Sequence, residues 1–180
     1  MHGMNRSIVA TLASLVLAAS TLRAADPDAQ AALTASVEQL RHVVGDWDVA
    51  TEFLNEDGSI ARSVSGSYSF QWVVVDRVVA GRSDIPELKQ SSGILFYVNE
   101  SKQAIEMVSV GADGNLWIMT GKAGEEVRYT QEFDSAAGKA QLRFTRYNVS
   151  ADRFESRMEY SEDGGKTWKP GNHQLFERKN

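Results

Sequence analysis

The sequence predicts an all-β protein, an up-and-down antiparallel β-barrel of about ten strands, with one helix before it. Three observations predict this fold. Beyond residue 45 apolar residues recur at every second position, as in half-buried strands. These segments are short, start roughly 8 to 14 residues apart and are joined by Gly-containing turns. No Pro-rich or low-complexity linker interrupts them, and a meander of this length closes to avoid bare edges.

The first 24 residues are predicted to be an export signal. Arg6 precedes an apolar run from Ile8 to Leu17, and small residues lead to a cleavage site after Ala24 or Ala25. That run is shorter than the roughly 20 residues that span a bilayer, and no later segment is long and apolar enough to be transmembrane. We therefore expect a periplasmic or secreted protein, with a signal peptide at 1–24, a capping helix within 25–45 and a barrel domain at 46–180.

Composition narrows the possible partners and chemistry. The chain has no cysteine, which excludes disulfides and thiol nucleophiles and fits a bacterial periplasmic protein stabilised by packing. Loss of the signal changes the formal charge from −5 to about −7, because Arg6 and Arg23 leave with it. An acidic chain repels phosphate backbones and anionic membranes, so nucleic acid is not an expected partner. The oligomeric state stays open.

The helix is predicted from "DAQAALTASVEQLRHVVG", residues 28–45. Leu33, Val37, Leu40 and Val44 form one apolar stripe, and Gly45 ends the helix.

The strands are predicted from alternation. Trp47 and Phe53 share a face in 46–53, and Asp57–Gly58 makes a hairpin turn. Residues 71–83 have a continuous apolar centre, which indicates one strand covered on both sides. The remaining segments are 59–70 with Ile60, Val64, Tyr68 and Phe70 on one face, 93–98, 103–110, 115–120, 126–133 with Val127, Tyr129 and Phe133 on one face, 153–160 with Phe154, Met158 and Tyr160 on one face, and a last hairpin ending in 173–179.

The last hairpin carries "SEDGGKTW", residues 161–168, which has the spelling of the Asp-box found in sialidase propellers. Ser161 and Asp163 can accept backbone N–H groups, Gly165 permits positive φ, and Trp168 returns the chain to the sheet. A single copy in about 156 residues cannot build a propeller. We therefore interpret the motif as a structural turn with no part in glycoside chemistry.

Four segments together carry a resemblance: "GDW" at 45–47, "FQWVVVDRVVAGRS" at 70–83, the "SEDGGKTW" hairpin and "FER" at 176–178. The chain from Leu40 to Arg178 resembles the bacterial domain-of-unknown-function family 1579, a lipocalin-like (calycin) barrel. It departs from that pattern at Val75-Asp76-Arg77, where Gly-Gly-Arg is expected. The resemblance implies a cavity, no established reaction, and a Trp47 beside Gly45 that closes the barrel base.

Candidate ligand-binding residues follow from the faces of the strands. Arg62 shares parity with the apolar face of 60–70, so it can pair with an internal acid or with the carboxylate of an amphipathic ligand, or lie near a strand end and reach water. Arg77 and Arg146 allow the same interpretations, and Tyr68 and Tyr129 are candidate wall residues. We expect non-catalytic binding of a small apolar or amphipathic molecule inside the barrel.

Two alternatives remain open. His173 resembles in position the single histidine through which nitrobindins, related barrels, hold haem, and a haem-binding protein or other enzyme on this fold would use it. His42, in the last turn of the helix, is placed where positive charge is favourable. The second alternative is a protein–protein interaction module. No metal site, catalytic residue or cofactor is predicted, because no suitable ligand spacing or triad occurs.

Overall fold

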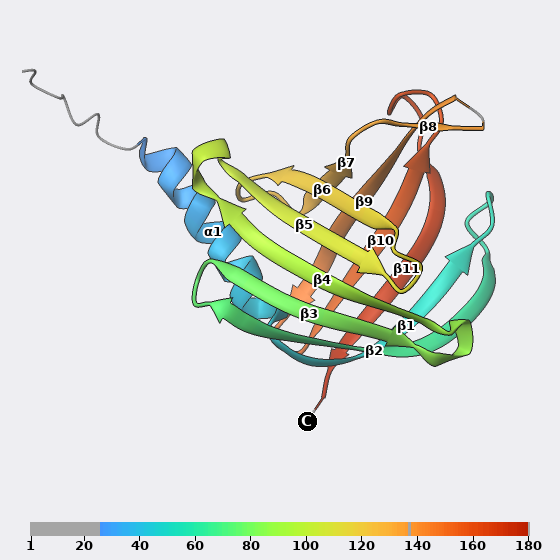
Figure 1. The fold of residues 1–180 in the computed structure, drawn as a ribbon, viewed down its shortest axis with the longest axis horizontal. Helices are drawn as coiled ribbons and strands as arrows, with labels where there is room; N and C mark the ends of the chain where they lie inside the picture. The colour runs from blue at the N-terminus through green and yellow to red at the C-terminus, as the bar shows by residue number, and fades with distance from the viewer. Residues whose placement is uncertain (1–25, 137, 180) are drawn as a thin grey trace, which may run out of the picture.

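One helix, α1 (Pro27–Val43), precedes a closed antiparallel β-barrel in the computed structural model, which describes residues 26–136 and 138–179 (Figure 1). Ten strands form the barrel, and a short eleventh, β8, extends β9 as a hairpin. The strands are β1 (Gly45–Leu54), β2 (Ile60–Val74), β3 (Val78–Ile85), β4 (Gln90–Asn99), β5 (Ala104–Gly111), β6 (Leu116–Lys122), β7 (Val127–Thr130), β8 (Phe133–Ser135), β9 (Gly138–Ser150), β10 (Arg153–Ser161) and β11 (Lys169–Arg178). Two 3₁₀ turns, η1 (Pro86–Leu88) and η2 (Glu100–Lys102), flank β4.

The barrel closes because its last strand pairs with its first. Most neighbours are consecutive in the chain, β11 pairs with β1, and β9 pairs with both β7 and β10. Every pairing is antiparallel, as a meander of hairpins requires. The predicted fold class is confirmed. The predicted export signal lies outside the described residues.

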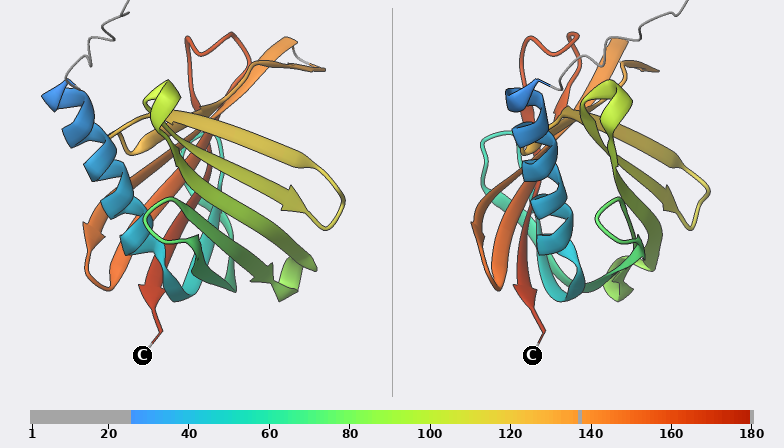
Figure 2. Two further views of the ribbon diagram at one scale, coloured as in Figure 1. Left: turned by 60° about the vertical axis from the view of Figure 1, so that its left-hand side comes forward. Right: turned by 90° about the vertical axis from the view of Figure 1, so that its left-hand side faces the viewer.

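Helix α1 covers one end of the barrel (Figure 2). Its N-cap is Asp26, whose carboxylate accepts the Asp28 N–H at 3.1 Å, and Pro27 opens the first turn. Its buried face is Leu33, Ser36, Gln39, Leu40 and Val43, so the stripe is rotated from the predicted one and includes two polar residues. Those polar residues bind the β6–β7 turn: Ser36 Oγ accepts Gly124 N–H, and Gln39 Nε2 donates to the Glu125 carbonyl. These two bonds explain the rotation.

Within residues 26–136 and 138–179, no helix combines the length and the apolar character needed to cross a membrane.

The apolar core fills the end of the barrel that α1 covers. Trp47 is fully buried, its ring lies edge-on to Phe154 at 4.9 Å, and Phe154 stacks on Phe176 at 4.2 Å. The Trp47 Nε1–H donates to the Val43 carbonyl at 2.8 Å, so the polar atom of this indole is satisfied at the end of α1. Members of this core, including Leu40, Val43 and Phe154, also line the cavity described below.

The predicted single strand at 71–83 is wrong. The structure has a β2–β3 hairpin there, whose turn contains Asp76 with φ of +59°. Val73, Val74 and Val75 are 60%, 50% and 69% exposed, so this apolar run is not covered on both sides. Asp tolerates the left-handed conformation better than most residues, which lets the chain reverse without glycine.

The predicted face of 126–133 is also reversed. Arg128 and Thr130 are buried, whereas Tyr129 is exposed. Arg128 lies opposite Phe144 of β9, and Tyr129 lies opposite Arg143. Directly opposed residues share a face of the sheet, so the inward Phe144 places Arg128 inside. The strand also ends at Thr130, and Phe133 belongs to β8.

The 161–168 segment forms the β10–β11 turn. Ser161 Oγ accepts the Gly165 N–H at 2.9 Å, and Asp163 accepts the N–H groups of Lys166 and Thr167. The Thr167 hydroxyl and these backbone donors lower the pKa of Asp163, and Gly165 has φ of +80°. Trp168 Nε1–H donates back to the Gly165 carbonyl. All these bonds are internal to the hairpin.

Candidate ligand-binding cavity

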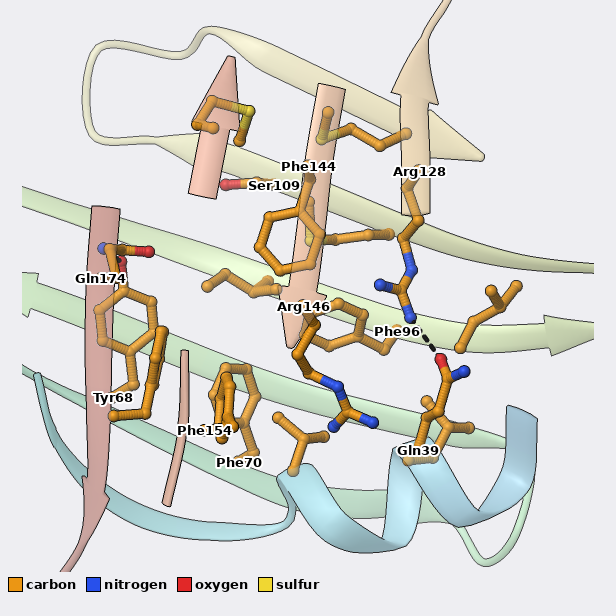
Figure 3. A pocket seen from close by; sticks show the side chains of 18 of the residues that line it. Gln39, Tyr68, Phe70, Phe96, Ser109, Arg128, Phe144, Arg146, Phe154 and Gln174 are labelled. Atoms are coloured by element: carbon orange, nitrogen blue, oxygen red, sulfur yellow. Dashed lines mark hydrogen bonds between the residues drawn. The ribbon is translucent and has the colours of Figure 1, made fainter. Parts of the chain in front are cut away.

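A cavity of about 250 Å³ lies inside the barrel, next to α1 (Figure 3). Its wall is mainly apolar, and its few polar groups are one tyrosine, one serine, two glutamines and two arginines. The lining residues are Gln39, Leu40, Val43, Tyr68, Phe70, Ile94, Phe96, Ile105, Met107, Ser109, Trp117, Met119, Arg128, Leu142, Phe144, Arg146, Phe154, Met158, Gln174 and Phe176. A largely apolar wall with a few polar groups is the usual composition of a small-molecule site.

The wall is built by strand alternation. Residues two apart on one strand point to the same face, so Ile105, Met107 and Ser109 of β5 all line the cavity. The same rule brings in Leu142, Phe144 and Arg146 from β9. Helix α1 adds Gln39, Leu40 and Val43 as a base. The site is therefore formed by most of the barrel strands and by the helix.

Tyr68 and Gln174 form a polar group on one side of the cavity, and this group is internally satisfied. Gln174 Nε2 donates to the Tyr68 hydroxyl at 3.2 Å and to Thr51 Oγ1 at 3.0 Å. Burial raises the pKa of Tyr68, so its hydroxyl stays protonated at neutral pH. The structure places the predicted wall residue Tyr68 in the cavity lining.

Arg146 also lines the cavity, and its charge is already neutralised. Its Nε and Nη2 donate to the two carboxylate oxygens of Glu126, both at 2.8 Å. Nη1 lies 3.4 Å from His42 Nδ1, while His42 Nε2 lies 2.6 Å from the Ser150 carbonyl oxygen. Those partners require a neutral His42 that donates from Nε2 and accepts at Nδ1. Burial also lowers the pKa of His42, which favours the neutral imidazole even at a helix end where positive charge is favourable.

Arg128 is the cavity residue that the sequence did not single out. It is 3% exposed, and the central carbon of its guanidinium lies 5.9 Å from the centre of the Phe96 ring and 5.6 Å from that of Phe144. Nη2 donates to Gln39 Oε1 at 2.8 Å, the bond drawn in Figure 3. Among the described residues, Nε has no hydrogen-bond partner and no carboxylate forms an ion pair with this side chain. Burial lowers the pKa of Arg128 to about 10, which still leaves it a cation at pH 7.

The other end of the barrel, opposite α1, carries the mouth. Trp117 lines the cavity yet is 40% exposed, and its ring contacts Phe133 at 5.7 Å. Arg62 lies at this end with an exposed side chain, where a 3.8 Å ion pair joins it to Glu87 of η1. It therefore takes the strand-end position that the sequence left open, outside the cavity lining.

Two further predicted residues lie away from the cavity. Arg77 is in the β2–β3 turn and pairs with Glu100. Tyr129 is on the outer face of the barrel, with its ring 5.9 Å from that of Trp168. Of the five predicted ligand-binding residues, the structure brings only Tyr68 and Arg146 to the cavity.

His173 is on the outside of the barrel, which does not fit the haem alternative. Its neighbour Gln174 faces the cavity, and adjacent strand residues face opposite ways. Both ring nitrogens of His173 are engaged, Nδ1 with Glu52 at 2.9 Å and Nε2 with Glu155 at 3.1 Å. In the part of the chain that the structure describes, no group of three or more His, Asp or Glu residues is arranged to hold a metal ion.

Comparison with known proteins does not identify a function for this chain. No family model matches the chain, and no curated protein matches it. Among solved structures, the chain is similar to EF1p2_mFAP2b bound to DFHBI, with 16% sequence identity and a TM-score of 0.39. The match covers 81% of this chain and 98% of that chain. Membership of family 1579 therefore stays a prediction.

Proposed function

We propose that this protein binds a small, mainly apolar molecule inside the barrel and does so without catalysis. The observation that carries the proposal is the cavity of about 250 Å³, walled by apolar side chains and closed at its base by α1. Water takes about 30 Å³ per molecule in the liquid, so the space equals about eight waters. A wall with so few polar groups favours an organic molecule over ordered water.

The mouth supports the same proposal. Trp117 is both part of the wall and exposed, so apolar surface continues from the interior to the solvent. An apolar ligand entering there keeps contact with apolar side chains along its path.

We also propose that the protein is a lipocalin-like member of family 1579 that acts in the periplasm or after secretion. Support for the family is the arrangement of the Gly45–Trp47 segment at the closed base of the barrel. Support for export is the signal-like sequence of residues 1–24 and the absence of cysteine from the sequence. Cell fractionation of a bacterium that expresses the full chain tests the second point.

Filling the cavity tests the function. Ser109 faces the cavity, and the next residue on β5, Val110, faces outward and is 43% exposed. We expect the neutral fluorophore N-phenyl-1-naphthylamine to bind the purified protein and to lose most of its affinity in Ser109→Trp. The matched control Val110→Trp, which adds a Trp on the outside, is expected to bind like the parent. Equal binding by both variants would place the fluorophore outside the barrel and contradict the proposal.

A second candidate is a protein–protein interaction module, and one surface favours it. Val110, Leu116 and Ile118 are 43%, 56% and 48% exposed and lie together on the outer face of β5 and β6. Exposed apolar groups of this kind often mark interfaces. Sedimentation equilibrium of the protein and of Ile118→Lys tests it: a dimer that the substitution dissociates would support this function, and a monomer at high concentration would remove it.

A further inference from the structure

We propose that the ligand of this cavity carries a single negative charge, a carboxylate on an otherwise apolar body, and that Arg128 is its anchor. The inference rests on the proposed binding function and names the class of ligand for that same site. It assigns the role of charged anchor to a residue that the strand pattern had placed outside the barrel.

The charges around the base of the cavity do not cancel. Arg146 and Glu126 form a two-pronged ion pair, which accounts for one cation and one anion. His42 is neutral in the tautomer that its two partners require. Arg178, which also lies at the base, pairs with Asp152 at 3.5 Å. Arg128 is the remaining cation of this group, and Gln39, the one hydrogen-bond partner that the described residues provide, is an uncharged amide. The base therefore holds one net positive charge.

A buried charge without a counter-charge is costly. Removing a guanidinium from water is unfavourable unless nearby groups replace its hydration, and each buried donor without an acceptor adds to the cost. For Arg128, two aromatic faces and one amide replace part of the lost hydration. Arg128 Nε, a fixed donor in the planar fork, has no partner among residues 26–136 and 138–179. Nε itself is fully buried, whereas Arg128 as a whole lines the cavity, so an anion in the cavity supplies the missing counter-charge to the part of the guanidinium that faces it.

The shape of the donor group selects the anion. A guanidinium presents parallel N–H donors that match the two oxygens of a carboxylate. A dianion such as a phosphate monoester would need a second free cation, and Arg146 is already paired with Glu126. The site is therefore matched to a monoanion.

The polar groups also give the ligand a direction. Figure 3 shows Arg128 and Gln39 on one side of the pocket and Tyr68 with Gln174 on the other. Tyr68 and Gln174 are satisfied by their own hydrogen bonds and carry no charge, so they do not require a charged group on the ligand. We infer that the carboxylate lies beside α1 and that the apolar body lies among the aromatic side chains, including Phe70 and Phe144.

A pair of probes with the same alkyl chain and with a charged or a neutral head group tests the anchor. Octanoate and octanamide have the same alkyl chain, and titration calorimetry at pH 7 measures the affinity of the purified protein for each. We expect octanoate to bind at least tenfold more tightly, because hydrogen bonds to charged groups are the stronger class. In Arg128→Met the octanoate affinity is expected to fall by roughly 10- to 100-fold, with little change for octanamide.

Controls separate the anchor from general effects. Arg62→Met removes an exposed arginine at the mouth and is expected to leave both affinities unchanged. Arg128→Lys keeps the charge but loses the fork, so part of the preference for octanoate should survive. The comparison of the two probes on the unmodified protein stands even if Arg128→Met fails to fold.

The outcomes distinguish the two proposals. Equal affinity for octanoate and octanamide would overturn the anionic anchor and leave the binding function intact. A preference for octanoate that persists in Arg128→Met but is lost in Arg62→Met would move the anchor to the mouth and overturn the role of Arg128. No binding of either probe, together with no binding of N-phenyl-1-naphthylamine, would remove both proposals.

Discussion

The guanidinium of Arg178 lies over the indole ring of Trp47, with its central carbon 4.2 Å from the ring centre. Its Nη1 donates to the Val44 carbonyl at 2.8 Å and Nη2 to the His42 carbonyl at 2.9 Å. One side chain of the last strand thus holds the end of α1 and the first strand together. The base of the cavity depends on this contact, because Val43 of α1 lines the cavity just before it.

Replacing Trp47 by alanine is predicted to destabilise the protein strongly. The ring is fully buried and its N–H bond to Val43 fixes the end of α1, so we expect a loss of about 3–5 kcal/mol in the free energy of unfolding. Urea denaturation followed by circular dichroism measures it. Trp168→Ala, in the β10–β11 turn, is the comparison and should cost less. A loss below about 1 kcal/mol for Trp47→Ala, small on this scale, would contradict the assignment.

Gly45 is predicted to resist substitution for two separable reasons. Its φ of +128° is unfavourable for any residue with a Cβ, and that Cβ would meet Nη1 of Arg178. Gly45→Ala should therefore cost more than the roughly 1–3 kcal/mol expected from the backbone alone. In an Arg178→Met background only the backbone part should remain. Equal costs in the two backgrounds, measured as a double-mutant cycle by urea denaturation, would show that the two residues do not interact.

The stability of the protein is predicted to fall as the pH drops below about 6.5 because of His42. Burial lowers the pKa of this imidazole from its usual 6.5, and the charges of Arg146 and Arg178 lower it further. The hydrogen bond to Ser150 and the charge of Glu126 raise the pKa and offset part of this effect. Above pH 6.5 both folded and unfolded chains hold it neutral. Below it the unfolded chain takes up a proton that the folded chain resists, so unfolding is favoured.

Urea denaturation at pH 7.5 and 5.5 checks this prediction, with His42→Asn as the control. The variant should lose less stability between the two pH values than the parent does. Carboxylates such as Glu106, whose pKa is lowered chiefly by the hydroxyl of Tyr97, act in the same direction but below about pH 4.5. Identical losses in the parent and in His42→Asn would contradict the neutral, buried imidazole.

The two cavity arginines are predicted to differ in their effect on stability. Arg146→Met leaves the carboxylate of Glu126 without its partner and should destabilise the protein by about 1–3 kcal/mol, less than a fully buried pair because Glu126 is one-third exposed. Arg128→Met removes a buried charge that has no counter-charge, so its stability should lie within about 1 kcal/mol of the parent or above it. Thermal unfolding without ligand compares them. A larger loss for Arg128→Met would mean that its charge is compensated.

The sequence pattern correctly predicted the elements that depend on the spacing of neighbouring residues. The helix at 27–43 and the outward–inward alternation of β1 and β10 follow from spacing, and both are present. The β2–β3 reversal was missed because its apolar valines favour a strand and its turn uses Asp76 in place of the Gly or Asn that marks most tight turns. Single-residue strain of this kind has little signature in one sequence.

The site was harder to predict because it depends on which face of each strand points inward. In 126–133 the apolar residues Val127 and Tyr129 indicated the wrong face, and only the opposing Phe144 of β9 decides that Arg128 is inside. That pairing is set by the closure of the barrel, beyond the reach of a local window. The cavity itself is the difference between the volume inside ten strands and the side chains that fill it.

Native mass spectrometry of the protein, purified from the expressing cells without refolding, tests the central claim most directly. We predict an additional mass of a few hundred daltons or less that is lost on denaturation, as a non-covalent ligand of this cavity would be. In negative-ion spectra the released molecule should be a monoanion. Two results together would contradict a ligand-binding barrel. The protein would carry no additional mass as purified, and its mass would not change after incubation with octanoate or N-phenyl-1-naphthylamine.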